Sequence, residues 1–263
     1  MPATGTSPEQ QARLHALWDS LADFGQGDID RAWRHLLEEM CGLLHADNAM
    51  WAGVVRLSHP SMSDPLGGWR MPVVKYLRPL PGIDATIRDY KDSLDAGPDE
   101  KSIRYHAQGG RFRVLCLADL VEPEWFQSEF YQRFFRGGMD AVDVMFVGAP
   151  VNDDTEAGLA FYRREMPFDR DACALAEEAL RGLRWFQRQL LLGHGLLLAD
   201  APLTPVEQQV LQAILQGLSA KEVAAQLDHS LHTTNEYHSR LYRKFGVGGR
   251  AELMALWLGH ARR

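Results

Sequence analysis

The densest group of side chains that could do chemistry lies between residues 232 and 244, where polar and basic residues recur at spacings of three and four. Asn235 and Ser239 would share one face of a helix there, and Arg243 would continue that face by a further turn. Arginine bonds guanine through two parallel hydrogen bonds, asparagine does the same with adenine, and serine or lysine can hold a phosphate. These residue types at this spacing predict contact with double-stranded DNA.

Three helices with defined beginnings would position these side chains. Thr204–Glu207 is a capping box with proline in the first turn, and Ser219–Glu222 is a second one. Gly217 is the expected left-handed residue at the end of the first helix. A turn at residues 228–230 precedes a third helix from about 231 to 245. Two short helices, a turn and a longer helix are the geometry of a helix-turn-helix.

The third predicted helix divides into an inward face and a polar face. Thr234, His238, Leu241 and Phe245 recur at helical spacing and are expected to pack on the other two helices. The N-terminal half of a recognition helix usually lies against the bases. We therefore expect the earlier polar residues of the helix to read bases and the later ones to contact the phosphate backbone. Asn235, Glu236 and Ser239 form the base-reading group, and Arg240, Arg243 and Lys244 form the backbone group. An ordinary helical bundle with a solvated face would show the same periodicity, because basic residues also complement a helix C-terminus.

An ordered series of short motifs runs through this segment without gaps: Leu203-Thr204-Pro205-x-Glu207, Val210-Leu211, Gly217-Leu218-Ser219-x-Lys221-Glu222-Val223-Ala224, Ser230-x-x-Thr233, Tyr242-Arg243-Lys244-Phe245-Gly246-Val247 and Arg250-Ala251-Glu252-Leu253. The series resembles the DNA-binding domain of LuxR/FixJ-type regulators, over about the last quarter of the chain. The resemblance implies a four-helix domain whose last helix, from about Gly249 to His260, helps to form a homodimer on DNA. It also implies that Lys221 touches a phosphate, and it places Thr233 in the DNA-binding set.

Three residues of the recognition helix depart from this family's pattern. Valine is common where Thr234 stands, lysine where Asn235 stands, and histidine where Tyr237 stands. Losing a cation at position 235 should weaken the attraction to the phosphate backbone and flatten the salt dependence of binding. The departures leave open an alternative, a regulator that acts mainly through protein–protein contacts with weak or no DNA binding.

The preceding part of the chain is predicted to be a mixed α and β domain. The elements expected are a helix that Ser7 caps, a helix over 28–45, strands over 49–57, 69–77, 112–117, 143–151 and 159–163, and one long helix from Asp169 to Leu192. We therefore expect an α+β sensor domain, with an antiparallel sheet flanked by helices, over 1–195. A linker over 196–202 and an all-α four-helix helix-turn-helix domain over 203–263 would follow.

The kind of sensor is indicated only in outline. A phosphoacceptor receiver would begin with a strand, whereas this chain opens with helices. The Trp, Tyr and Asp-Pro set of an acyl-homoserine-lactone domain is not matched in order or spacing, and residues 130–169 are more similar to the GAF-like sensor halves of LuxR-type proteins. Aromatic walls suit a small hydrophobic or aromatic ligand, although the same residues could simply pack a core. The candidate ligand-binding residues are Trp51, Trp69, Tyr76, Trp125, Phe126, Phe130, Phe134, Met145 and Phe161, of which those from 125 to 134 are expected on one helix.

Composition limits the remaining possibilities. The 263 residues are 46% hydrophobic and 24% charged with a net charge of −7, but residues 203–263 alone carry +2 and the rest −9. Only the C-terminal part could therefore approach DNA without net repulsion. Three widely spaced cysteines without metal-ligand spacing predict reduced thiols in a cytoplasmic chain, and no signal peptide, membrane helix, metal site or cofactor motif is expected. Walker, G-x-S-x-G, H-E-x-x-H and dinucleotide motifs are absent, so we expect a one-component transcription regulator rather than an enzyme.

Overall fold

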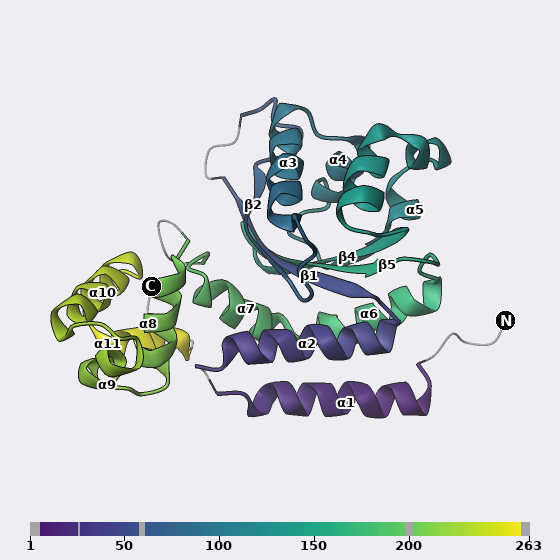
Figure 1. Cartoon of the computed structure of the whole chain (residues 1–263). Coiled ribbons are helices and arrows are strands. Elements are labelled where there is room, and N and C mark those ends of the chain that lie inside the picture. The colour runs from purple at the N-terminus through teal and green to yellow at the C-terminus, as the bar shows by residue number, and fades with distance from the viewer. Residues whose placement is uncertain (1–5, 26, 58–60, 198–201, 259–263) are drawn as a thin grey trace. The chain divides into compact units, whose positions relative to one another are not determined.

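The computed structural model describes residues 6–25, 27–57, 61–197 and 202–258. The chain divides into two compact units, which we call the sheet unit (residues 1–18 and 36–184) and the helical unit (residues 19–35 and 185–263) (Figure 1). The domain boundaries expected at 195 and 203 stay predictions, and residues 198–201 of the expected linker lie outside the described residues. No helix in the described part of the chain is both long and apolar enough to cross a membrane.

A five-stranded antiparallel sheet forms the centre of the sheet unit, with strand order β2-β1-β5-β4-β3. Its strands are β1 (Asn48–Arg56), β2 (Trp69–Tyr76), β3 (Arg113–Cys116), β4 (Asp143–Asn152) and β5 (Thr155–Arg163). All five strands were expected, and a turn at residues 153–154 joins β4 to β5. Successive side chains of a strand point to opposite faces, so Met50, Ala52 and Val54 of β1 share one face while Trp51 lies on the other.

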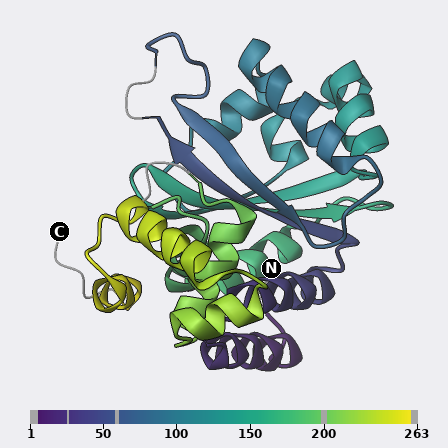
Figure 2. The same cartoon turned by 60° about the vertical axis from the view of Figure 1, so that its left-hand side comes forward.

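Helices cover both faces of this sheet. Figures 1 and 2 show α3 (Ile83–Ala96), α4 (Glu100–His106) and α5 (Leu117–Leu120) on one face, with α6 (Arg170–Arg181) on the opposite face. The first two helices are α1 (Pro8–Asp23) and α2 (Ile29–Leu44). The expected start of α1 is confirmed, since Ser7 and Gln10 exchange the two hydrogen bonds of a capping box, at 2.9 and 3.2 Å.

Two expectations for the helices were wrong. The single long helix expected from Asp169 is two helices, α6 and α7 (Arg184–Gly193), because Gly182 ends the first at residue 181. The single aromatic helix is a 3₁₀ helix, η1 (Pro123–Gln127), followed by a π-helix, η2 (Tyr131–Gly138). Helices α3 and α4 had not been expected, because their apolar positions are few and interrupted by charges.

The C-terminal helices of the helical unit are α8 (Pro205–Leu215), α9 (Ala220–Gln226), α10 (Leu231–Lys244) and α11 (Arg250–Trp257). They agree with the four predicted helices, except that residues 259–263 lie outside the described residues. Val210, Ile214, Val223, Leu241 and Leu253 are fully buried at the centre of their shared core. Each such side chain contributes about 1.5–3 kcal/mol by leaving water. The α+β domain followed by an all-helical domain is therefore confirmed as the fold class.

Candidate DNA-recognition helix and ligand cavity

The start of α10 is fixed by local hydrogen bonds. Ser230 Oγ accepts from Thr233 N at 3.0 Å, and buried Thr234 donates its hydroxyl to Ser230 O at 3.1 Å. The preceding turn places Asp228 in the left-handed region, at a φ of 54°, which aspartate tolerates better than most residues. Local hydrogen bonds and the turn at Asp228 therefore together define where α10 begins.

The two preceding helices pack against α10 and have ends defined by hydrogen bonds. Both predicted capping boxes are confirmed, at Thr204–Glu207 and at Ser219–Glu222. Gly217 has the expected positive φ, 94°, at the end of α8. Arg250 donates to Ile214 O at 2.9 Å and to Leu218 O at 2.7 Å, so the guanidinium binds carbonyls at and just after the end of α8.

The predicted DNA-facing side chains of α9 and α10 form a mostly exposed polar row. Within this row, Ser239 Oγ donates to Asn235 O at 2.9 Å. Glu236 lies 3.5 Å from His232, an exposed neighbour on the same helix. The Arg240 guanidinium lies 5.2 Å from the centre of the Tyr237 ring, which is a cation–π distance. The exposed members are Lys221, Asn235, Glu236, Ser239, Arg240 and Arg243, and Thr233 is half-buried.

Lys244 differs from the rest of the predicted set. Its Nζ lies 2.7 Å from Glu207 Oε2, and the two side chains are 22% and 2% exposed. Burial raises the pKa of Glu207, but the hydrogen bonds from Lys244 and from Thr204 outweigh this effect and lower the pKa below its usual value. Lys244 therefore neutralises a buried carboxylate that also caps α8, whereas Arg243 is free to contact an external anion.

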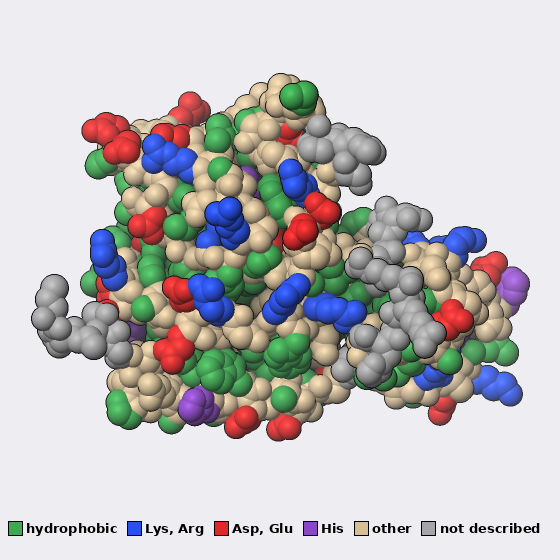
Figure 3. Space-filling view, turned by 180° about the vertical axis from the view of Figure 1, so that it is seen from behind, with side chains coloured by type: hydrophobic (Ala, Val, Ile, Leu, Met, Phe, Trp, Pro, Cys, Tyr) green, Lys and Arg blue, Asp and Glu red, His purple; other side chains and the backbone are tan. Residues whose placement is uncertain are grey.

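Charge is not gathered into one large patch of a single sign on the face that Figure 3 shows, where basic and acidic side chains are interspersed. Residues 203–263 carry a net charge of only +2, so the polar row of α9 and α10 offers local rather than long-range attraction to a polyanion. Groups of three or more His, Cys, Asp or Glu that could hold a metal ion do not occur among the described residues.

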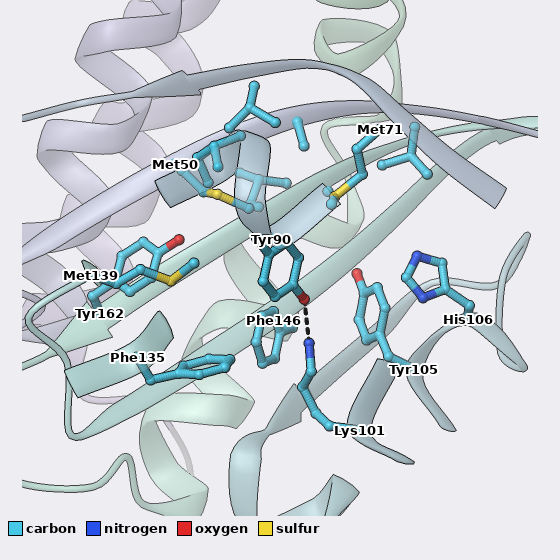
Figure 4. A pocket seen from close by; sticks show the side chains of 16 residues that line it. Met50, Met71, Tyr90, Lys101, Tyr105, His106, Phe135, Met139, Phe146 and Tyr162 are labelled. Carbon is cyan, nitrogen blue, oxygen red and sulfur yellow. Dashed lines mark hydrogen bonds between the residues drawn. The ribbon is translucent and has the colours of Figure 1, made fainter. Parts of the chain in front are cut away.

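A small cavity lies in the sheet unit between β1, β2, β4 and β5 on one side and α3, α4 and η2 on the other (Figure 4). Its volume is about 50 Å³, which is room for a few water molecules at most. Most of the wall is apolar. Two side chains of α4 bring basic nitrogen atoms to it, the ammonium group of Lys101 and the imidazole of His106. Burial lowers the pKa of His106 to about 4, so its imidazole is neutral near pH 7.

None of the nine predicted ligand-binding residues lines this cavity. Trp51, Met145 and Phe161 are fully buried but lie one residue out of phase with Met50, Phe146 and Tyr162, which do line it. Strand alternation therefore turns them to the other sheet face. The remaining six lie around the cavity rather than in its wall: Tyr76, Trp125, Phe126, Phe130 and Phe134 belong to the apolar cluster that surrounds Phe135 and Tyr90, and Trp69 lines a neighbouring groove.

Four of the cavity residues that the sequence analysis missed, all with polar side-chain atoms, come from unpredicted helices. Tyr90 lies on α3, while Lys101, Tyr105 and His106 lie on α4. One local signal was present, because Asp99 caps α4 by accepting from Ser102 N at 3.2 Å. An Asp-x-x-Ser sequence marks a helix start but says nothing of the cavity that the helix meets.

Comparison with known proteins gives a family match over the C-terminal part of the chain. Residues 201–257 match the family described as bacterial regulatory proteins, luxR family. The response regulator Rre1 of Synechocystis sp. (strain ATCC 27184 / PCC 6803 / Kazusa) is 36% identical over 91 residues, which are 33% of this chain and 39% of that protein. The chain thus covers well under half of that relative's length.

Longer similarity extends to a regulator from Aeromonas salmonicida. The putative HTH-type transcriptional regulator in the exeN 3′ region is 41% identical over 165 residues, which are 53% of this chain and 81% of that protein. The solved structure of SdiA in complex with octanoyl-rac-glycerol covers 98% of this chain and 97% of its own, at 13% identity and a TM-score of 0.48. None of these similarities supports a GAF-like sensor specifically, so that resemblance stays a prediction. The chain belongs to the HTH-type transcriptional regulators, and its C-terminal helices form a luxR-family helix-turn-helix domain.

Proposed function

We propose that the chain is a one-component regulator that binds a specific operator by inserting α10 into the major groove. The observation that carries the proposal is the exposed row of Asn235, Ser239 and Arg243 on a helix that is fixed at its start and along its buried face. A helix held in this way presents the same hydrogen-bonding groups to each duplex that it meets. The proposed binding form is a homodimer, as the resemblance to LuxR/FixJ-type regulators implies.

Control by a small molecule is the second part of the proposal. The apolar cavity of the sheet unit, with few polar groups in its wall, has the character of a small-molecule site. A ligand would change DNA binding by favouring one arrangement of the two units over another, to the extent that it binds the two arrangements with different affinity.

Selection of bound duplexes from a random pool tests the DNA-binding part. Full-length protein at two salt concentrations should enrich a palindrome whose half-sites lie about one helical turn apart, roughly 10 base pairs. Enrichment should weaken at the higher salt concentration because cations on α9 and α10 replace counterions on the phosphates.

Single substitutions distinguish base readout from backbone contact. Arg243→Ala should weaken binding to all duplexes and reduce the salt slope by about one, whereas Asn235→Ala should change which sequence is preferred. Arg88→Ala, which removes an exposed arginine from α3 in the other unit, is the matched control and should bind as the parent does. If both α10 variants bind like the parent, this face is not the DNA face.

A regulator that acts mainly through protein–protein contacts is the second candidate. The ion pair between Lys244 and Glu207 favours it, because it leaves Arg240 and Arg243 as the exposed cations of α10. Failure of the full-length protein to enrich any duplex, at either salt concentration and with or without small molecules that stabilise the sheet unit, would support this second function.

A further inference from the structure

The cavity of the sheet unit contains one buried positive charge. Lys101 is 3% exposed, and Figure 4 shows its side chain reaching from α4 toward the hydroxyl of Tyr90. Lys101 Nζ donates to Tyr90 Oη at 2.5 Å. The same nitrogen lies 5.1, 5.5 and 5.2 Å from the ring centres of Tyr90, Phe135 and Phe146, which are cation–π distances.

No carboxylate pairs with Lys101 in the part of the chain that the structure describes. The nearby acids have other partners: Asp99 caps α4 and accepts from Trp125 Nε1 at 3.1 Å, and buried Glu156 pairs with Arg113 at 2.7 Å. The charges of Arg113 and Glu156 cancel each other. The ammonium of Lys101 is therefore the uncompensated charge at the cavity wall.

An ammonium group has three N–H donors, and the hydrogen bond to Tyr90 uses one of them. Burial of an ammonium without an anion is unfavourable, and aromatic rings offset only part of the lost hydration. A ligand that brings an anion to this nitrogen would remove that penalty and gain a charge-assisted hydrogen bond.

We propose that the ligand of this cavity is a small apolar or aromatic carboxylic acid, whose carboxylate binds Lys101 and the Tyr90 hydroxyl while its apolar part lies against the sheet. The proposal rests on the small-molecule control proposed above and specifies the class of ligand. A monoanion fits because Lys101 supplies a single positive charge. Neutral His106 adds no second cation, so a dianionic phosphate is not matched.

The apolar part of the ligand requires the cavity to open. About 50 Å³ is far below the roughly 300 Å³ at the lower end of usual ligand sites. Met50, Met71 and Met139 line the cavity, and their unbranched side chains can change conformation to make room. A compact acid such as benzoate or hexanoate therefore fits better than a long-chain lipid.

Binding of matched acid and neutral probes to the full-length protein tests the proposal. Benzoate, phenylacetate and hexanoate are compared with the corresponding primary amides by calorimetry and thermal shift. At least one acid should bind about tenfold or more tightly than its amide, as expected for a hydrogen bond between charged groups. Lys101→Met, which keeps the length and apolar bulk of the side chain, should abolish this preference and leave amide binding intact.

Two further variants separate this role from a structural one. Tyr90→Phe keeps the ring and removes the hydroxyl, so it should reduce the preference for the acid less than Lys101→Met does. Lys91→Met alters a lysine of α3 that lines a different groove and should leave the preference unchanged. Circular dichroism of each variant confirms that it is folded.

The outcomes distinguish failure of this proposal from failure of ligand control in general. If acids and amides bind equally to the parent, or if Lys101→Met retains the preference, the site takes small molecules but Lys101 does not select an anion. If neither acids nor amides bind, the carboxylate proposal and the ligand function of this cavity both fail, while DNA binding is judged separately by duplex selection.

Discussion

Replacement of Lys244 by alanine should destabilise the helix-turn-helix domain rather than remove a DNA contact. Lys244 Nζ lies 2.7 Å from Glu207 Oε2, and the same oxygen accepts from Thr204 N at 2.8 Å at the start of α8. Without Lys244, a carboxylate that is 2% exposed keeps its capping hydrogen bond but loses its counterion. The charge on Glu207 would then be buried without compensation.

The size of the effect follows from the burial of the two partners. Removing one partner of a fully buried pair costs about 3–5 kcal/mol. Since Lys244 is 22% exposed, water can partly replace it, and we expect a loss of about 1–3 kcal/mol. For a unit of this size such a loss lowers the melting temperature by roughly 5–15 °C.

Differential scanning calorimetry of the full-length protein measures this loss, with Arg243→Ala as the matched control. Arg243→Ala should melt like the parent but bind DNA more weakly. A double-mutant cycle of Lys244→Ala with Glu207→Gln should give a coupling free energy of about 1 kcal/mol or more, because the two side chains are in direct contact. The coupling should shrink as the pH falls through the lowered pKa of Glu207, because the protonated acid no longer needs a counterion.

The opposite pattern would refute this reasoning. If Lys244→Ala melts at the parent temperature and reduces both DNA affinity and the salt slope, Lys244 contacts the phosphate backbone, as the sequence analysis expected. If Lys244→Ala lowers the melting temperature and also lowers the DNA affinity of the folded protein to a similar extent, Lys244 serves both roles.

Two further predictions concern the sheet unit. Burial lowers the pKa of His106 to about 4, against roughly 6.5 in the unfolded chain. As the pH decreases, the unfolded state therefore binds the proton first. The free energy of unfolding should fall by up to about 3 kcal/mol between about pH 6.5 and about pH 4. Urea unfolding at about pH 7 and pH 5 should show a smaller loss in His106→Gln than in the parent, with exposed His232→Gln as the control, and an unchanged loss would count against a neutral buried imidazole. Cys116 Sγ lies 3.1 Å from Cys173 Sγ, and the hydrogen bond from Cys116 lowers the pKa of Cys173, so hydrogen peroxide should join the two as a disulfide with release of water. Peptide mapping should find this link and leave Cys41 reduced, since burial raises the pKa of Cys41 to about 11; a mixture of pairings that includes Cys41 would contradict the prediction.

The sequence by itself determined the features that depend on neighbouring residues. The capping boxes at Ser7, Thr204 and Ser219 are confirmed because each joins atoms three residues apart. The positive φ of Gly217 and the order of the four C-terminal helices follow from the same short-range rules. The family follows from these residues as well, and because it is a family of transcription regulators, the expectation that the chain is not an enzyme is confirmed.

Tertiary structure decided which of these side chains meet. The residues next to Lys244 in the sequence predict an exposed cation that could contact DNA. Its partner Glu207 lies 37 residues earlier in the chain, so the sequence gives no local sign of the ion pair. Trp51 and Met50 are equally apolar neighbours, and only the packing of helices on the two sheet faces decides that Met50 lines the cavity. Lys101 carried no recognisable motif, because its environment is built by rings from α3, η2 and β4. Period-two alternation marks two faces of a strand, but it does not say which face will contain a space, since that depends on contacts between residues distant in the sequence.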